Sequence, residues 1–306
     1  MDCKFSRNQR VAAITKMLIE NPNKTINLNT FTEKFNAAKS TISEDIVLVR
    51  ESFNKLKVGS IVTVAGAAGG VKYVCNVSQK DSMEFLNELC NEIMDENRLI
   101  LGSFLYLTDI LSNPKIIKKA GNILASKFIN KNIDFVVTVE TKGIPLAYEV
   151  ANMLGVELVI VRRDNKITEG TTISINYLSG SSGRIQTMSL SKKSLPNGSK
   201  CIFIDDFMKA GGTAVGIKQM LKEFGSELLG IGVLIDDKGT TNKLVDDYIA
   251  LIDYKGIEGT DHVSAKISSR LSRIYKFDAL YSKKKDIKIR FNKNRLKIKN
   301  SMHKKL

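Results

Sequence analysis

One short segment, residues 201–213, constrains the fold of this 306-residue chain more than any other part of it. An apolar run over 201–204 ends in two neighbouring acidic residues, and a stretch of small residues then leads to Gly-Gly-Thr. The apolar run predicts a buried strand, and the two glycines predict a loop that opens a helix. We therefore expect a strand–loop–helix unit of an α/β protein.

The chemistry of this loop suits a sugar phosphate. Gly211 and Gly212 allow the backbone to approach a ligand closely, and free amides at the start of a helix can hold a phosphate. The Thr213 hydroxyl adds a donor, and Asp205 and Asp206 offer acceptors for paired sugar hydroxyls. The segment therefore predicts a ribose 5-phosphate site. Neither a Walker nor a Rossmann glycine motif occurs in the chain.

A second loop of the same kind lies earlier in the chain. Thr141, Lys142 and Gly143 follow an apolar run at 135–139 and precede a helical pattern at 144–154. Lys142 can offer charge and Gly143 a close backbone amide. The alternative is an ordinary turn that carries a solvated lysine.

The segment between the two loops, 162–184, is polar and rich in Gly and Ser. One interpretation is a mobile flap in which Lys166 or Arg184 closes on phosphates. The other is a solvent-exposed hairpin, and both interpretations stay open at this point.

Apolar runs alternate with helical patterns from about residue 80 onward. Strand-like runs occupy 135–139, 158–161, 172–177, 186–190, 201–204 and 229–235. Helical spacing covers 80–96, 115–130, 144–154 and 213–224. Continuous apolar strands between helices predict a mainly parallel sheet that is covered on both faces.

The N-terminal part has a different pattern. Helical spacing at 7–20 is followed by a short helical stretch that contains Phe31 and Phe35, and then by a third helix that Ser40 or Thr41 can cap. Two β-type runs, 61–64 and 71–74, flank a tip with three glycines. Three helices followed by a hairpin predict a winged helix-turn-helix, an α+β domain.

These patterns predict three parts of the chain. Residues 1–76 form the winged-helix domain, residues 77–275 the larger α/β domain, and residues 276–306 a basic tail, which is either an added strand or a disordered arm. The net charge of +15 lies at the two ends: 1–75 has 11 Lys and Arg against 6 Asp and Glu, and 265–306 has 15 against 2. Basic ends can bind a polyanion such as DNA.

Several classes of protein are disfavoured by the composition. The four cysteines are scattered singly, so neither a zinc site nor a disulfide framework is indicated, and we expect no metal site. The two histidines lie near the C-terminus, which disfavours histidine-based catalysis in the main body. No apolar run approaches the length of a membrane span, and no signal peptide is visible, so we expect a cytoplasmic protein without membrane contact.

Taken together, these motifs resemble those of the purine operon repressors of Gram-positive bacteria, over roughly residues 4–250. The resemblance rests on long runs that occur in one order: 38–45, 66–73, 141–147, 174–177 with 179–182, and 205–213. It implies that a type I phosphoribosyltransferase-like domain follows the winged helix in the chain. It also implies a homodimer that binds double-stranded operator DNA. It also implies that phosphoribosyl pyrophosphate (PRPP) relieves DNA binding, and that guanine alarmone nucleotides compete for the same pocket.

The resemblance assigns residues to the two ligands. The PRPP-binding residues would be Thr141, Lys142, Gly143, Lys166, Asp205, Asp206, Phe207, Lys209, Ala210, Gly211, Gly212 and Thr213. The DNA-binding residues would be Arg7, Arg10, Lys16, Lys39, Ser40, Thr41, Ser43 and Lys72, with the first turn of the third helix in the major groove. No cofactor is required, although Mg²⁺ commonly accompanies a pyrophosphate.

The chain departs at one position from the pattern of active phosphoribosyltransferases, and this departure bears on whether it is a sensor or an enzyme. Active phosphoribosyltransferases commonly have a threonine where this chain has Lys209 and Ala210, so one phosphate-binding hydroxyl is missing. This difference favours a regulator of purine biosynthesis and transport genes that uses the fold for sensing and has no catalytic residues. The alternative is a purine phosphoribosyltransferase with a fused regulatory domain.

Overall fold

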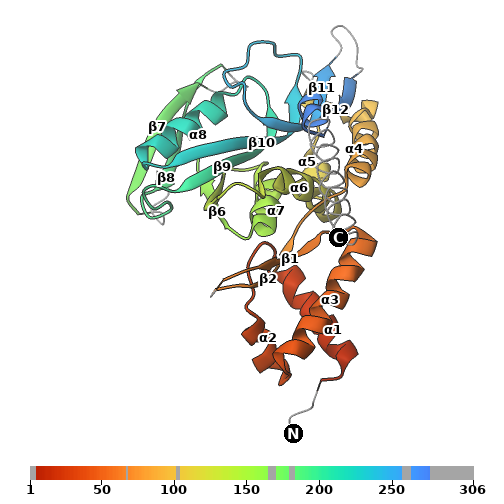
Figure 1. Ribbon diagram of the computed structural model, residues 1–306. Coiled ribbons are helices and arrows are strands. Elements are labelled where there is room, and N and C mark those ends of the chain that lie inside the picture. The colour runs from red at the N-terminus through yellow and green to blue at the C-terminus, as the bar shows by residue number, and fades with distance from the viewer. Residues whose placement is uncertain are drawn as a thin grey trace, which may run out of the picture.

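The computed structural model describes residues 5–66, 68–100, 104–164, 170–178, 183–256 and 263–275 (Figure 1). Lys166 and the basic tail 276–306 therefore lie outside the described residues. No helix within the described ranges has both the length and the apolar character needed to cross a membrane.

The N-terminal part is a winged helix, as predicted, and it lies below the rest of the molecule in Figure 1. Its elements are α1 (Arg7–Glu20), α2 (Leu28–Phe35), α3 (Lys39–Leu56), β1 (Ser60–Val64) and β2 (Gly70–Val74). The two strands pair antiparallel, and the segment after α1 adds bridges from Pro22 and Ile26 to β2. The helices and the hairpin share one core built from Ile14, Leu18, Phe31, Phe35, Ile42, Ile46, Val49 and Phe53.

The predicted cap of the third helix is wrong. The helix begins at Lys39 after Ala38, whose side chain makes no capping bond, so Ser40 and Thr41 lie inside the first turn. The reason is the preceding turn: Asn36 ends α2 in the left-handed conformation, with φ of 44°, and the chain enters α3 at once.

The larger part is built on a six-stranded sheet in the order β12-β11-β10-β9-β5-β6, parallel except for β12. Its strands are β5 (Phe135–Val139), β6 (Glu157–Val161), β9 (Lys200–Met208), β10 (Glu227–Asp237), β11 (Ile249–Gly256) and β12 (Val263–Ile267). The helices around it are α4 (Gln79–Ile93), α5 (Thr108–Leu111), α6 (Pro114–Phe128), α7 (Ile144–Leu154) and α8 (Gly212–Glu223). A small antiparallel pair, β3 (Leu99–Ile100) and β4 (Phe104–Leu105), follows the 3₁₀ turn Glu96–Arg98.

Both faces of the sheet are buried, which explains why the strands are apolar throughout. Alternate residues of one strand enter different cores: Ile202 and Ile204 meet α6 and α7, whereas Cys201 and Phe203 meet α8. The predicted covered, mainly parallel sheet is therefore confirmed.

Two of the predicted strands do not belong to this sheet. They form a separate antiparallel hairpin of β7 (Thr172–Leu178) and β8 (Ile185–Ser191), which lies against α8 at the left of Figure 1. One face of the hairpin is buried by Tyr177, Met188 and Leu190. The hairpin is thus not fully solvent-exposed, because one of its faces packs against the core. Residues 165–169 and 179–182, which belong to the predicted flap, lie outside the described residues.

Candidate functional site

The two predicted ligand loops leave the sheet at its topological switch point. β5 and β9 are neighbours, but the chain leaves β5 through α7 toward β6 and leaves β9 through α8 toward β10, on the opposite side. In open α/β sheets a crevice forms outside the carboxyl ends of two such strands, and ligands bind there.

Gly143 brings the first loop against the second. A Cβ placed on Gly143 would lie 2.5 Å from Oδ1 of Asp205 and 2.8 Å from Oγ1 of Thr138. Only glycine allows this approach, so the role of a close backbone amide that the sequence assigned to Gly143 fits the geometry. The Thr138 hydroxyl is buried without a hydrogen-bond partner among the described residues, and the peptide bond between Glu140 and Thr141 is cis.

The second loop differs from the prediction in one respect. β9 does not end at Ile204 but continues through the acidic pair to Met208, because Asp205 pairs with Val233 of β10. The turn to α8 then comes at Gly211, whose φ of 87° is left-handed. The first amides of α8 have no partner within the helix, as at every helix start, and Thr213 lies in this first turn.

Asp205 is the electrostatic centre of the crevice. Desolvation raises its pKa well above the usual value of an aspartate, and the neighbouring charge of Asp206 raises it further, while Arg163 opposes the shift. The Asp206 amide donates to Oδ1 of Asp205 at 2.9 Å. A carboxylate held beside another carboxylate gains most from a ligand that donates hydrogen bonds, such as a sugar with free hydroxyls.

The remaining predicted residues of the site fall into three groups. Thr141 and Lys142 are exposed on the first loop, and Lys209 and Ala210 are half-buried on the second. Phe207 is directed into the core, where its ring meets Tyr254 edge-to-face with 6.2 Å between centroids. Its side chain therefore supports the sheet and is not free to contact a ligand in the crevice.

Lys243, which no sequence pattern indicates as a functional residue, supports the second loop from its far side. Its Nζ donates to the carbonyl oxygens of Met208, at 3.1 Å, and Lys209, and forms an ion pair with Asp236 at 2.8 Å. An isolated lysine in a polar stretch carries no signal in the sequence, because such residues are usually solvated.

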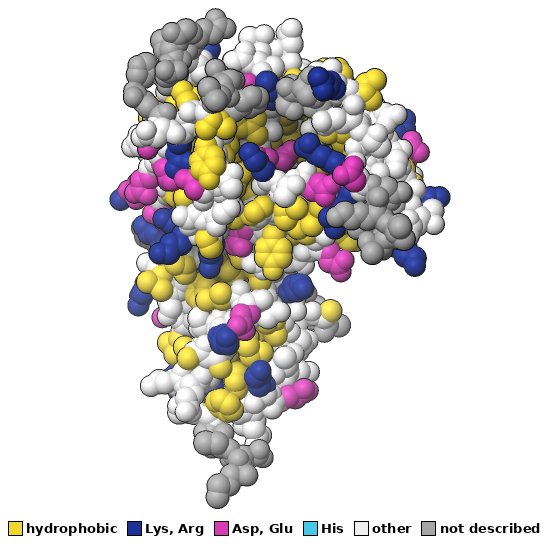
Figure 2. Space-filling view, turned by 180° about the vertical axis from the view of Figure 1, so that it is seen from behind, with side chains coloured by type: hydrophobic (Ala, Val, Ile, Leu, Met, Phe, Trp, Pro, Cys, Tyr) yellow, Lys and Arg dark blue, Asp and Glu magenta, His cyan; other side chains and the backbone are white. Residues whose placement is uncertain are grey.

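The predicted DNA-binding surface is centred on the start of α3. Lys39, Ser40 and Ser43 are exposed there, and Thr41 is half-buried. The face in Figure 2 shows the narrower N-terminal part below, with Lys and Arg side chains scattered among apolar ones. On that face the positive charge is not gathered into one patch.

Arg10 has a structural role that the sequence did not reveal. Its Nε donates to Asp45 at 2.7 Å, its Nη1 donates to the Phe5 carbonyl, and its side chain is 11% exposed. Asp45 is fully buried on α3, and Arg7 approaches it at 3.5 Å. The Arg10–Asp45 pair therefore fixes α3 against α1, which leaves Arg10 little exposed surface for the predicted phosphate contact.

The other two basic residues predicted to contact DNA have partners of different kinds. Lys16 forms an exposed ion pair with Glu20 at 2.5 Å, one turn further along α1. Lys72 on β2 is half-buried and donates to Oδ1 of Asn23 at 3.1 Å.

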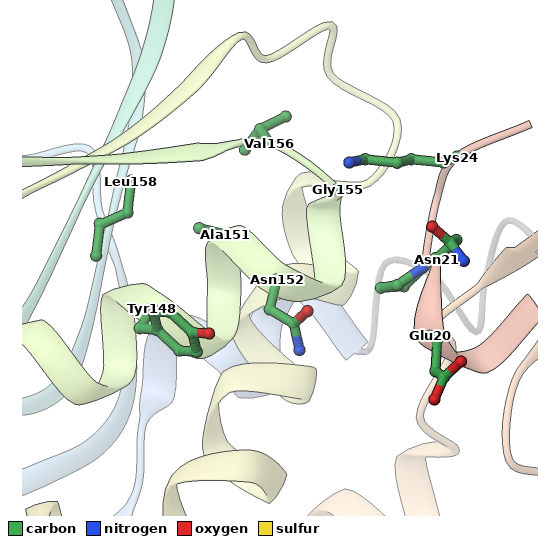
Figure 3. A pocket seen from close by; sticks show the side chains of 10 residues that line it. Glu20, Asn21, Lys24, Tyr148, Ala151, Asn152, Gly155, Val156 and Leu158 are labelled. Carbon is green, nitrogen blue, oxygen red and sulfur yellow. The ribbon is translucent and has the colours of Figure 1, made fainter. Parts of the chain in front are cut away.

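The two parts of the molecule meet where α7 ends. Nδ2 of Asn23 donates to the Leu154 carbonyl at 2.9 Å, and a Cβ on Gly155 would lie 2.5 Å from the Pro22 carbonyl oxygen. A pocket of about 220 Å³ lies beside this contact. Figure 3 shows that residues of α7, including Tyr148 and Asn152, face the segment after α1 across it. Among the described residues no group of three or more His, Cys, Asp or Glu could hold a metal ion.

Comparison with known proteins agrees with both halves of the structure. The family described as bacterial purine repressor, N-terminal, matches residues 6–75, and the phosphoribosyl transferase domain matches residues 107–264. The chain is 48% identical over 249 residues to the purine biosynthesis transcriptional repressor PurR of Bacillus subtilis (strain 168), covering 81% of this chain and 87% of that protein. It is 46% identical to the probable purine biosynthesis transcriptional regulator PurR of Streptococcus pneumoniae serotype 4, covering 83% and 93%.

A further relative is the purine biosynthesis transcriptional activator PurR of Lactococcus lactis subsp. lactis, at 39% identity over 89% of this chain and 99% of that protein. These relatives share the whole arrangement of a winged helix followed by the α/β domain, since the matches cover more than four-fifths of the chain. The chain therefore belongs to the family of bacterial purine repressors.

Proposed function

We propose that this protein is a DNA-binding transcriptional regulator that represses purine biosynthesis and transport genes, with PRPP as the effector that relieves DNA binding. The observation that supports it most is the juxtaposition of Gly143 and Asp205 at the switch point of a sheet whose chain also carries a winged helix. The names of its relatives, repressor in one and activator in another, agree on purine genes and differ in the sign of regulation.

PRPP would bind in the crevice between the two loops. In this proposal Asp205 and Asp206 accept from the ribose hydroxyls, the amides of 209–213 hold the 5-phosphate, and Thr141, Lys142 and Gly143 contact the pyrophosphate. Phe207 would contribute its backbone, and Lys166, which lies outside the described residues, would contribute positive charge to the phosphates. Mg²⁺ fits this arrangement, because carboxylate oxygens and ligand phosphates are its usual partners, and Asp205 and Asp206 would face it. Guanine alarmone nucleotides would compete for the same crevice.

The protein would act as a homodimer. In each chain the boundary between the winged-helix domain and the effector-binding domain would lie between residues 76 and 77, and the basic tail would begin at residue 276. The exposed start of α3, with Lys39, Ser40 and Ser43, would read the operator, while Thr41 would support it. Arg7 and Lys16 would contact the DNA backbone, and Lys72 in the hairpin would reach the minor groove or a phosphate.

The helix α7 offers a physical connection between the two sites. It begins directly after Gly143, which lies beside Asp205, and its last carbonyl accepts the bond from Asn23. Asn23 in turn accepts from Lys72 of the hairpin. Eleven helical residues span about 16 Å and move as a unit. A shift of the first loop on ligand binding would thus reach the winged helix.

Operator binding with and without PRPP tests the proposal. The wild-type protein and the Asp205→Ala/Asp206→Ala variant would be titrated on DNA from purine-gene control regions. PRPP is expected to weaken binding by the wild type about 5–150-fold, the usual range of allosteric coupling, and to have no effect on the variant. Unchanged affinity of the wild type would overturn the proposal.

The alternative function, a purine phosphoribosyltransferase, draws on the match to the phosphoribosyl transferase domain and on the intact acidic pair. Assay of PRPP consumption with each purine base separates the two. We propose that the protein shows no turnover, because the phosphate loop carries Lys209 and Ala210 where an enzyme commonly has threonine.

A further inference from the structure

Lys243 gathers an unusual set of acceptors behind the second loop. Besides the carbonyls of Met208 and Lys209 and the carboxylate of Asp236, its Nζ donates to the Asp237 carbonyl at 2.7 Å. An ammonium has three protons for these four acceptors, so no bonding capacity is left for a ligand. Its side chain is 10% exposed. The Lys243 ammonium is therefore fully used in contacts within the protein.

The position of this ammonium is fixed by a fully buried carboxylate. Asp236 lies at the end of β10 with no exposed side-chain surface, and it accepts from Lys238 at 2.5 Å and from the Tyr248 hydroxyl at 3.0 Å as well as from Lys243. A buried carboxylate is tolerated only when it is paired and hydrogen-bonded. The cluster thus holds Lys243 in one place, directly behind the loop.

Three successive carbonyls of the loop face this cluster. Lys243 takes those of Met208 and Lys209, and the Leu244 amide donates to that of Ala210 at 2.8 Å. The peptide bonds here are trans, since the cis bond among the described residues is the one after Glu140. In a trans peptide the N–H points opposite to the C=O. The amides of Lys209, Ala210 and Gly211 are consequently turned away from Lys243, all to the other side of the loop.

We propose that Lys243 is a positioning residue for a phosphate monoester, the 5-phosphate of a ribose. It holds the Met208 and Lys209 carbonyls and so turns the amides of residues 209 and 210 toward one anion, beside the amide of Gly211, whose orientation the Leu244 amide fixes. Such a row of amides forms an anion-binding nest. The proposal rests on the proposed function, since it names the residue that shapes the phosphate loop of that site. It assigns no contact between Lys243 and the ligand itself.

The geometry predicts a selective effect. Lys243 supports the second loop, whereas Gly143 and its neighbours lie on the first, so its loss should weaken the binding of ribose 5-phosphate and spare that of inorganic pyrophosphate. A general loss of positive charge near the crevice would instead weaken both anions. The ratio of the two affinities therefore distinguishes positioning from charge.

Calorimetry on the full-length protein tests this, with ribose 5-phosphate and pyrophosphate as separate probes. We expect Lys243→Met to weaken ribose 5-phosphate binding about tenfold or more, the size of effect that supporting groups behind a ligand shell have. Its affinity for pyrophosphate should stay within about twofold. The matched control is Lys238→Met, which removes an equal charge from the same carboxylate but none of the bonds to the loop carbonyls, and should bind both probes as the wild type does.

A double variant keeps the test valid if Lys243→Met fails to fold. Asp236→Asn/Lys243→Met removes the buried charge together with its partner, and should show the same selective loss. If the two variants that lack Lys243 bind ribose 5-phosphate as tightly as the wild type does, the inference about Lys243 is overturned. It is also overturned if they lose affinity equally for both probes, and in either case the proposed function still stands. Failure of the wild type to bind ribose 5-phosphate, pyrophosphate and PRPP would overturn the proposed function as well.

Discussion

Two neighbouring strands, β9 and β10, each carry an aspartate near their carboxyl end, and the pKa values of the two carboxyl groups are shifted in opposite directions. Asp236 accepts from two ammonium groups and a phenol, and although burial alone would raise its pKa, the bonds from Lys238 and Lys243 hold that pKa below its usual value. Asp205 has a raised pKa because of desolvation and the charge of Asp206.

This difference distinguishes a carboxylate that stabilises the fold, Asp236, from one that is available to a ligand, Asp205. A carboxylate whose partners are already in the protein stabilises the fold and has nothing left to offer a ligand. A carboxylate that is desolvated beside another acid is costly in the free protein, and a ligand that donates to it removes that cost. Two aspartates on adjacent strands of one sheet can thus be assigned opposite roles from their surroundings.

The largest expected effect comes from removing the supporting carboxylate. Asp236→Ala leaves the nearly buried ammonium of Lys243 without its counter-charge, which should lower the free energy of unfolding by about 3–5 kcal/mol. Asp205→Asn removes a repulsion and should leave that free energy unchanged or raise it. Urea unfolding of both variants measures this, and a larger loss for Asp205→Asn would reverse the two assignments.

A second test addresses how closely the two loops meet. Gly143→Ala would place a methyl group 2.5 Å from the Asp205 carboxylate and force the loops apart. The displaced amide would lose its hydrogen bond to the charged pyrophosphate, which is worth about 1.5–3 kcal/mol, so PRPP affinity should fall about 10–150-fold. Gly216→Ala is the control, because the nearest atoms to its methyl group belong to the hairpin and to neither loop: Cε of Met188 at 2.7 Å, and Cβ and Cγ of Tyr177 at 3.1 Å. It should change stability but not PRPP affinity, and equal effects on affinity would show that the approach of the loops is unimportant.

The pH dependence of folding should separate the two aspartates further. The lowered pKa of Asp236 gives stability that is present above the unfolded value of about 3.9 and is lost as the pH falls through the folded value. The raised pKa of Asp205 has the opposite sign: its cost begins to shrink as the pH falls through that raised value and is gone at the unfolded value of about 3.9. The stability difference between Asp205→Asn and the wild type should therefore shrink on acidification well above pH 4. A constant difference between about pH 7 and 4, in urea unfolding at each pH, would contradict this assignment.

The smallest effect is expected where the two parts of the molecule meet, far from both aspartates. Asn23 has a φ of 56°, so Asn23→Gly removes its side-chain bonds to Leu154 and to Lys72 without straining the backbone. Loss of one such bond costs about 1 kcal/mol. Operator affinity without PRPP should change little, while the factor by which PRPP weakens it should move toward one. A factor equal to that of the wild type would show that this contact does not carry the coupling.

Local signals were sufficient for much of this structure. The strand, acidic pair and glycines of 201–213 are contiguous, and the winged helix follows from helical spacing and a glycine-rich hairpin, so both could be predicted. The hairpin of β7 and β8 could not be assigned to its own sheet, because an apolar run is the same whichever strand it pairs with. The strands β11 and β12 were not predicted at all.

The relations across the site depend on topology, which the sequence does not display. Gly143 and Asp205 are distant in sequence and meet because β5 and β9 are neighbours in the sheet. Lys243 gained its role from a fold that brings the end of β10 beneath the turn after β9. The inward direction of Arg10 likewise follows from how α1 and α3 cross.

The buried carboxylate of Asp45 decides which side of α3 the solvent can reach. A helix by itself could rest on its neighbours at any rotation, but turning this one by a single residue would swing Asp45 away from Arg10 and leave a bare charge among apolar side chains. The buried Asp45 therefore determines that Lys39, Ser40 and Ser43, the residues predicted to contact DNA, lie on the exposed side of the helix. Substitutions at these positions would change the surface offered to a ligand, while Asp45 would keep the rotation of the helix unchanged.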